Sequence, residues 1–134
     1  MTSRVLALAA SAASAAVLAG CGLDVASPDL FVLTRTGEGS SLTMLVNDGG
    51  TVKCNGVTHS LSDPQLLTAR DLANSLDTDA KNHDSYAASS ASVYRYQVKL
   101  PDGTLSFPDT AAGRHSELAQ TEAFALQVAE NTCK

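Results

Sequence analysis

Basic side chains are scarce in this sequence. Its 134 residues include 9 Lys and Arg against 14 Asp and Glu, which gives a formal net charge of -5. A chain of this charge repels the phosphates of nucleic acid and offers no polybasic segment to anionic lipid. We therefore expect no nucleic-acid partner, and any membrane attachment has to be covalent or apolar.

Histidine and the common catalytic motifs are equally sparse. His59, His83 and His115 are scattered, and none stands four residues from another His or from a Cys, so their spacing does not support a zinc site. The sequence contains no G-x-S-x-G motif and no glycine-rich phosphate loop. We expect no catalytic residues, no metal and no cofactor, and hence no enzymatic activity.

Long hydrophobic runs are confined to the N-terminus. Arg4 precedes an Ala-, Leu- and Val-rich run over Val5–Leu18, which is the pattern of a signal peptide. The run is shorter than the ~20 apolar residues that a membrane-spanning helix needs. We assign residues 1–20 to a signal peptide, and a buried Ala-rich helix is the alternative.

The run ends in the letters LAGC, at Leu18–Cys21, which resemble the lipobox of bacterial lipoproteins. The resemblance implies diacylglycerol on the Cys21 thioether, cleavage after Gly20, and retention at the extracytoplasmic face of the cell membrane. Two or three acyl chains hold a protein stably, whereas one chain holds it only marginally. Residues 21–29 would then be the lipidated Cys and a tether of at most ~26 Å. A secreted protein in which Cys21 is incidental is the alternative.

The remaining residues, 30–134, have the length of one domain. Apolar and β-branched runs predict strands over 30–36, 42–46, 51–55, 93–100 and 105–109, with NDGG at Asn47–Gly50 as a hairpin turn. Apolar residues at helical spacing predict helices over 62–83 and 115–132.

The order β-β-β-α-β-β-α favours an α+β fold. We expect an antiparallel sheet of about five strands, with both helices packed on one face and the other face wet. Asp63 is the expected N-cap of the first helix and Pro64 its first residue. Tyr94 and Tyr96 alternate with polar residues and are expected on the core face of their strand.

One acid stands out from the solvated charges. The helical wheel places Glu122 among apolar neighbours on the last helix. A basic partner such as Arg95 or Lys99, or an edge position, is one explanation, and a site acid is the other.

Assigning Cys21 to lipid leaves the pair Cys54 and Cys133. Both occupy core-facing positions, one at the end of a strand and one at the end of the last helix. An extracytoplasmic location favours oxidation, so we expect a disulfide between them, with two separate buried thiols as the alternative.

Residues 30–133 as a whole, from LFVLTRTG to ELAQTEAF, resemble small actinobacterial lipoproteins of no assigned activity. The resemblance implies a single domain and carries over no catalytic residue. The layout from LTRTG through VKCNG is also similar to subtilisin-inhibitor-like domains and emfourin-type inhibitors. It departs from the first of these because the helix lacks a cysteine to pair with Cys54, and the cysteine beside the reactive loop is missing.

These patterns together predict a membrane-anchored, non-enzymatic binding or envelope-associated module whose ligand and protein partner are unknown. The alternative is a protease inhibitor, in which the loop over Asp84–Ser92 would enter the protease cleft.

Overall fold

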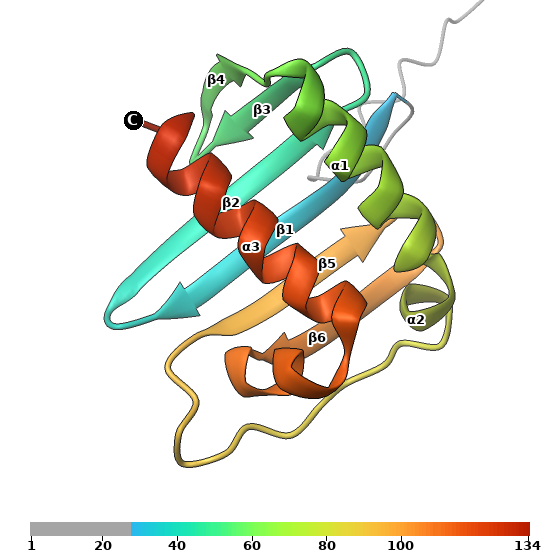
Figure 1. The fold of residues 1–134 in the computed structure, drawn as a ribbon, viewed down its shortest axis with the longest axis vertical. Helices are drawn as coiled ribbons and strands as arrows, with labels where there is room; N and C mark the ends of the chain where they lie inside the picture. The colour runs from blue at the N-terminus through green and yellow to red at the C-terminus, as the bar shows by residue number, and fades with distance from the viewer. Residues whose placement is uncertain (1–27) are drawn as a thin grey trace, which may run out of the picture.

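The structure is a computed structural model that describes residues 28–134. The signal peptide, Cys21 and most of the tether assigned from the sequence lie outside these residues. The described chain forms the following elements, drawn in Figure 1: β1 (Asp29–Gly37), β2 (Ser40–Asn47), β3 (Thr51–Cys54), β4 (Val57–Ser60), α1 (Asp63–Ser75), α2 (Asp77–Lys81), β5 (Arg95–Leu100), β6 (Gly103–Pro108), the 3-10 helix η1 (Asp109–Arg114) and α3 (Ser116–Asn131).

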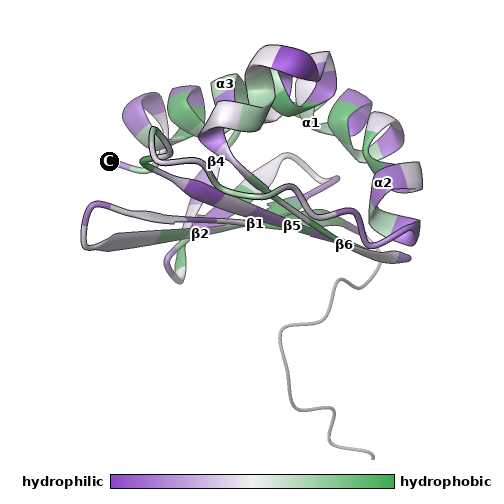
Figure 2. Cartoon of the chain, turned by 90° about the horizontal axis from the view of Figure 1, so that it is seen from below, coloured by the Kyte–Doolittle hydropathy of each residue, from purple (hydrophilic) through white to green (hydrophobic). Residues whose placement is uncertain are grey.

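The strands form one antiparallel sheet in the order β4-β3-β2-β1-β5-β6. The helices cover one face of this sheet and leave the other face open, as Figure 2 shows. The predicted α+β class, with helices on a single face, is therefore confirmed. None of the helices formed by residues 28–134 is long and apolar enough to cross a bilayer.

The sheet has six strands rather than about five, because a second hairpin follows β3. Asn55 and Gly56 have φ angles of 45° and 89°, the left-handed values that a tight hairpin turn requires. They lead into β4, which pairs with β3 from Cys54 and Val57 onward. The apolar pattern does not reveal β4, since this edge strand has four residues and none of them is fully buried.

The first predicted helix is divided into α1 and α2 at Leu76. Its N-cap is Ser62, so the prediction of Asp63 was wrong. The Ser62 hydroxyl accepts a hydrogen bond from the Gln65 N–H, and the Gln65 side chain accepts one from the Ser62 N–H. This reciprocal capping box needs Glu or Gln three residues after the cap, a spacing that Ser62 satisfies and Asp63 does not.

The core lies between the helices and the covered face of the sheet. Phe31 meets Phe124 edge-on with ring centroids 5.9 Å apart, and Tyr96 stacks on Phe107 at 5.2 Å. Tyr96 is buried as predicted, whereas Tyr94 precedes β5 and is only half-buried. The largest fully buried side chains are Phe31, Phe107, Phe124, Leu33, Met44, Leu72, Leu76, Leu105, Leu118, Val46, Val52 and Val98.

A disulfide joins Cys54 at the end of β3 to Cys133, just beyond α3, with Cα atoms 5.7 Å apart. The predicted pairing is confirmed. Close by, the Gln65 side chain donates to the Thr132 hydroxyl at 3.1 Å, so the start of α1 is also attached to the end of α3. These two links fix one end of α3 over the sheet.

Candidate functional site

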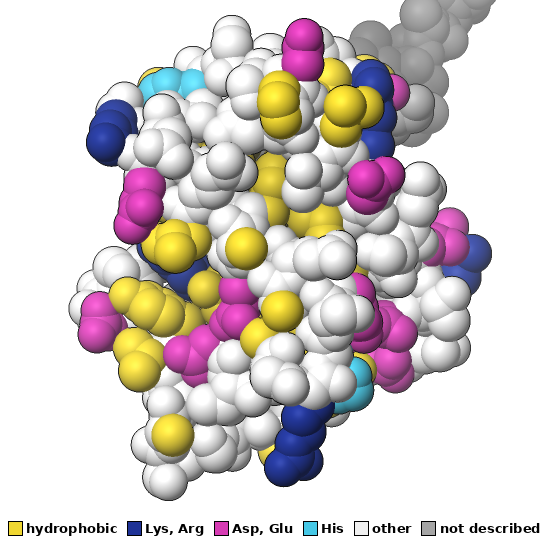
Figure 3. Space-filling view, in the orientation of Figure 1, with side chains coloured by type: hydrophobic (Ala, Val, Ile, Leu, Met, Phe, Trp, Pro, Cys, Tyr) yellow, Lys and Arg dark blue, Asp and Glu magenta, His cyan; other side chains and the backbone are white. Residues whose placement is uncertain are grey.

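A groove of about 750 Å³ runs along α3, between this helix, the end of β1 and the start of β5. We call it the α3 groove. Its volume is within the range of about 300–1,000 Å³ that is typical of ligand pockets. In Figure 3 it lies in the left half of the picture, where hydrophobic, acidic and basic side chains adjoin. Its lining consists of Arg35, Tyr94, Tyr96, Asp109, Ala119, Glu122, Ala123, Leu126, Ala129 and Glu130.

Small side chains of α3 make the floor of the groove. Ala119, Ala123, Leu126 and Ala129 recur every three or four residues and therefore share one side of the helix. Leu126 is 50% exposed and is one of the few large apolar side chains left open to solvent. Because alanine side chains are short, the three alanines beside Leu126 form a shallow apolar surface on which another chain could lie.

Glu122 projects from the same side of α3 and is half-buried. None of the residues 28–134 gives its carboxyl a hydrogen bond or an ion pair. Burial, and secondly the charge of Asp109, raises the pKa of Glu122 from 4.5 to about 7. The groove thus holds a carboxyl whose ionised form is poorly compensated by the protein itself.

The predicted partners of Glu122 lie on the other side of the sheet. Arg95 is exposed and donates to the Ser85 hydroxyl and the Tyr86 carbonyl oxygen. Lys99 alternates with the buried residues of β5, so it shares the open face with Arg95. The prediction that Arg95 or Lys99 pairs with the Glu122 carboxyl is therefore wrong. Glu122 lies instead at the rim of the groove.

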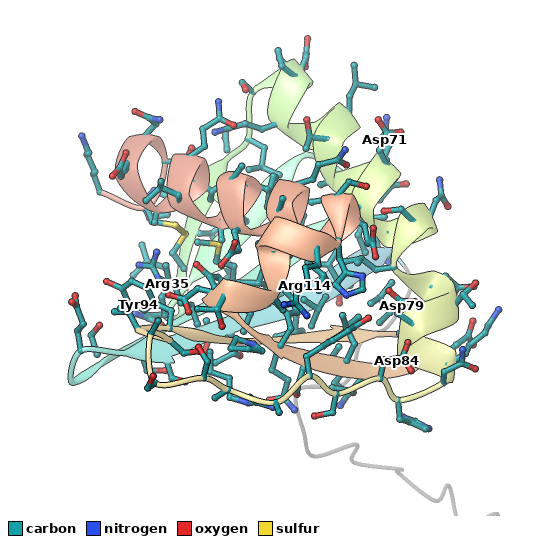
Figure 4. The ribbon with its side chains drawn as sticks, turned by 60° about the horizontal axis from the view of Figure 1, so that its bottom comes forward. Arg35, Asp71, Asp79, Asp84, Tyr94 and Arg114 are labelled. Atoms are coloured by element: carbon teal, nitrogen blue, oxygen red, sulfur yellow. A yellow bond between two sulfur atoms is a disulfide. The ribbon has the colours of Figure 1, made fainter. Side chains whose placement is uncertain are left out.

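Arg35 and the two tyrosines form the opposite wall. The Arg35 guanidinium lies over the Tyr94 ring, 4.9 Å from its centroid, and Figure 4 shows the two side chains next to each other. The Tyr94 hydroxyl donates to Glu38 at 2.8 Å, and this hydrogen bond is the main reason why its pKa is raised. Burial and then the charge of Glu122 raise the pKa of Tyr96, while Arg35 opposes that shift.

Asp109 closes one end of the groove and has a structural task. Its carboxylate accepts hydrogen bonds from the backbone N–H groups of Val93 and Tyr94, at 3.1 to 3.2 Å. These bonds hold the start of β5 against η1. Asp109 therefore contributes negative charge to the groove, while its oxygen atoms are used in hydrogen bonds that stabilise the fold.

A second, smaller hollow of about 370 Å³ lies between η1 and the loop after α2. Its walls include Tyr86 and His115, whose ring centroids are 4.8 Å apart. Nearby, burial and then the charge of Asp84 raise the pKa of Asp79. Figure 4 shows Asp79 and Asp84 on the same side of the molecule, away from Arg35. The α3 groove is the stronger candidate because it is larger and contains a carboxyl that has no partner within residues 28–134.

The loop predicted over Asp84–Ser92 runs along the surface and is attached near both ends (Figure 1). Ser85 forms a β-bridge with Ser106 of β6, and the Ser92 hydroxyl lies 2.8 Å from that of Thr110. These attachments cover part of the outer edge of β6.

The predicted site residues have different outcomes. Cys21 lies outside the described residues, and Cys54 and Cys133 form a structural disulfide. Within the part of the chain that the structure describes, no group of three His, Cys, Asp or Glu side chains is placed to hold a metal ion. Sequence reasoning identified Glu122 but missed Arg35 and Asp109, which join it only through the fold.

We compared the chain with known protein families, curated proteins and solved structures. No protein-family model matches the chain, and no curated protein or solved structure is similar enough to count as a match.

Proposed function

We propose that this protein is a lipid-anchored, extracytoplasmic binding module, and that the α3 groove is its ligand site. The single observation that carries the proposal is Glu122, a half-buried carboxyl that lines a groove of ligand size and has no partner among residues 28–134. Titratable groups with strongly shifted pKa values cluster at functional sites.

The arrangement favours binding over catalysis. Two-carboxyl chemistry, as in glycoside hydrolysis, requires two carboxyl groups that both act on the substrate. Among the lining residues, Asp109 is engaged by two backbone N–H groups and Glu130 is exposed to solvent, so Glu122 is the one half-buried carboxyl that lacks such hydrogen bonds. The lining instead offers charge, tyrosine rings and an apolar floor, which are the elements of recognition.

The anchor rests on the LAGC sequence that ends at Cys21. The described chain begins at Pro28 and enters β1 one residue later, so only a short segment separates the sheet from Cys21. A module held this close to the bilayer would meet ligands of the cell envelope.

Replacing Cys21 tests the anchor. In a bacterial host that lipidates proteins, the full-length chain should be labelled by an alkyne fatty acid and should sediment with membranes. Cys21→Ser should abolish the label and release the chain, whereas the double variant Cys54→Ala/Cys133→Ala should keep the label. Equal labelling of the Cys21→Ser variant would overturn the anchor.

Titration of the groove tests the binding function. Full-length chain in a non-ionic detergent is titrated with a lysine-containing pentapeptide, its glutamate counterpart and an N-acetylglucosamine tetramer, and amide NMR signals are followed. We expect at least one probe to shift signals of α3 residues 119–130 in a saturable way. If none of the three shifts them, the groove is not the ligand site.

Protease inhibition is the second candidate, favoured by the loop over Asp84–Ser92. An inhibitory loop has to be exposed and yet held in shape, and this loop is tethered by the Ser85–Ser106 bridge and by the Ser92 and Thr110 hydroxyls. Inhibition assays against secreted serine and metalloproteases test it. Inhibition that survives deletion of Ala87–Ala91 would exclude the loop as the inhibitory segment.

A further inference from the structure

We propose that the α3 groove binds an extended polypeptide segment that carries a Lys or Arg side chain, with the cationic group next to Glu122 and flanking apolar side chains on Ala123 and Leu126. The inference rests on the proposed function, because it names the ligand of the same groove. Three features of the groove support it: its charge, its dimensions and the chemistry of its floor.

The charge of the groove favours a cation. Its lining contains three acidic side chains, Asp109, Glu122 and Glu130, against the single base Arg35. The Arg35 charge already lies over the ring of Tyr94, so it is partly satisfied within the wall. A ligand cation beside Glu122 would offset the charge of Asp109, which disfavours the ionised form of Glu122.

An anionic ligand fits poorly for the same reason. Arg35 would have to leave the Tyr94 ring to meet it, and the ligand would lie beside three carboxyls. Like charges placed together in a partly desolvated interface repel strongly and oppose binding.

The dimensions favour a short stretch of polypeptide. The floor extends from Ala119 to Ala129, which at 1.5 Å per helical residue corresponds to roughly 15 Å. An extended chain advances about 3.3 Å per residue, so roughly four or five residues would span the floor.

The floor also distinguishes a peptide from a free polyamine. Ala119, Ala123 and Ala129 present methyl groups beside the exposed side chain of Leu126. A polyamine would satisfy the carboxyls and leave Leu126 uncovered. A peptide with an apolar residue next to its cationic one would satisfy both, which is why we assign the ligand to a protein.

Isothermal titration of the full-length chain in a non-ionic detergent tests the proposal. The probes are the capped pentapeptide Ala-Lys-Leu-Lys-Ala, the same peptide with Glu for Lys, and spermidine. We expect the lysine peptide to bind, the glutamate peptide to show no binding, and spermidine to bind at least tenfold more weakly. Spermidine binding as tight as that of the peptide would overturn the assignment to a polypeptide.

Two variants locate the interaction. Glu122→Gln should lower the affinity for the lysine peptide about tenfold, as expected for loss of one charge-assisted contact. Asp102→Asn, which removes a carboxylate from the turn between β5 and β6, should leave the affinity unchanged. Equal weakening in both variants would show that net charge rather than the groove attracts the peptide, and would overturn the proposal.

A pH series separates Glu122 from the other charges. The groups that line the groove with Glu122 are Arg35 from β1, Tyr94 and Tyr96 at β5, Asp109 from η1 and Glu130 from α3 itself. Binding should weaken between pH 8 and pH 6 as Glu122 takes up a proton, and this pH dependence should be absent in Glu122→Gln. The same pH dependence in both proteins would contradict the assigned role of Glu122.

The outcomes distinguish this inference from the function on which it rests. If the N-acetylglucosamine tetramer or the glutamate peptide occupies the groove and the lysine peptide does not, the binding module stands and its ligand class is wrong. If no probe binds, both proposals fail.

Discussion

At the scale of single residues, a few side chains lower the stability of the folded state. Glu122 is the clearest case, because the folded chain leaves its carboxyl half-buried and near Asp109. Its pKa of about 7 lies above the ordinary value of 4.5, so the folded state holds the proton more tightly than the unfolded state does. The contribution of Glu122 to stability is therefore present below pH 4.5 and is lost as the pH rises toward 7.

Glu122→Gln removes this titration and should stabilise the protein at high pH. At pH 8 we expect its free energy of unfolding to exceed that of the wild type by about 1 kcal/mol, a value reduced because the carboxyl is partly solvated. At pH 4 the two proteins should be equally stable. Urea unfolding at both pH values measures the difference, and a variant less stable at pH 8 would show that the carboxylate has a favourable partner.

Gly103, the first residue of β6, is a position where the structure leaves no space for a Cβ atom. A Cβ there would meet the backbone carbonyl of Ala80 in α2, which cannot move without shifting the helix. Gly103→Ala should lower the free energy of unfolding by about 2 kcal/mol. Gly113→Ala, where no atom lies within 4 Å of the new Cβ, is the matched control and should be neutral. Denaturant unfolding decides between them, and equal losses would contradict the steric explanation.

The start of α1 depends on two reciprocal hydrogen bonds. Ser62→Ala removes the hydroxyl that accepts from the Gln65 N–H, and it should lower the free energy of unfolding by about 1 kcal/mol. Ser90→Ala, in the exposed loop, should change it little. If thermal melting shows the same stability for both variants, the capping box contributes nothing measurable.

Elements with strong local patterns could be predicted from the sequence. In β5 the buried Tyr96, Val98 and Leu100 alternate with polar residues, and that period alone identifies a strand with one covered face. The break at Leu76 has no comparable local mark, since apolar residues continue at helical spacing across it. The break results from the packing of α2 against β6 and β5, and this packing cannot be predicted from the local sequence.

The candidate site could be predicted only in part. Glu122 disturbs the apolar pattern of α3, so periodicity identified it. Arg35 and Asp109 leave no such mark, because each is an ordinary charged residue until β1, η1 and α3 are brought together. The wrong expectation of Arg95 as a partner has the same origin, since it requires knowing which face of the sheet α3 covers.

For the molecule as a whole, the disulfide is the main covalent constraint within the described residues. It closes a loop with a sequence separation of 79 residues, and the chain-entropy relation gives about 4.5 kcal/mol as an upper value for its stabilisation. The double variant Cys54→Ala/Cys133→Ala should therefore unfold at a clearly lower denaturant concentration. Cys21→Ser, measured in the same detergent, should leave the midpoint unchanged, and a shift of equal size would contradict the assignment of the cysteines.

The same bond decides what happens when the chain is cut. The exposed loop over Asp84–Ser92 lies between Cys54 and Cys133 in sequence, so a protease that cleaves it leaves two fragments joined by sulfur. Limited proteolysis should give one band on a gel without reductant and two bands with it. If Cys21 anchors the chain to a membrane as proposed, cleavage alone would not release the fragment that carries α3, because the disulfide has to be reduced first.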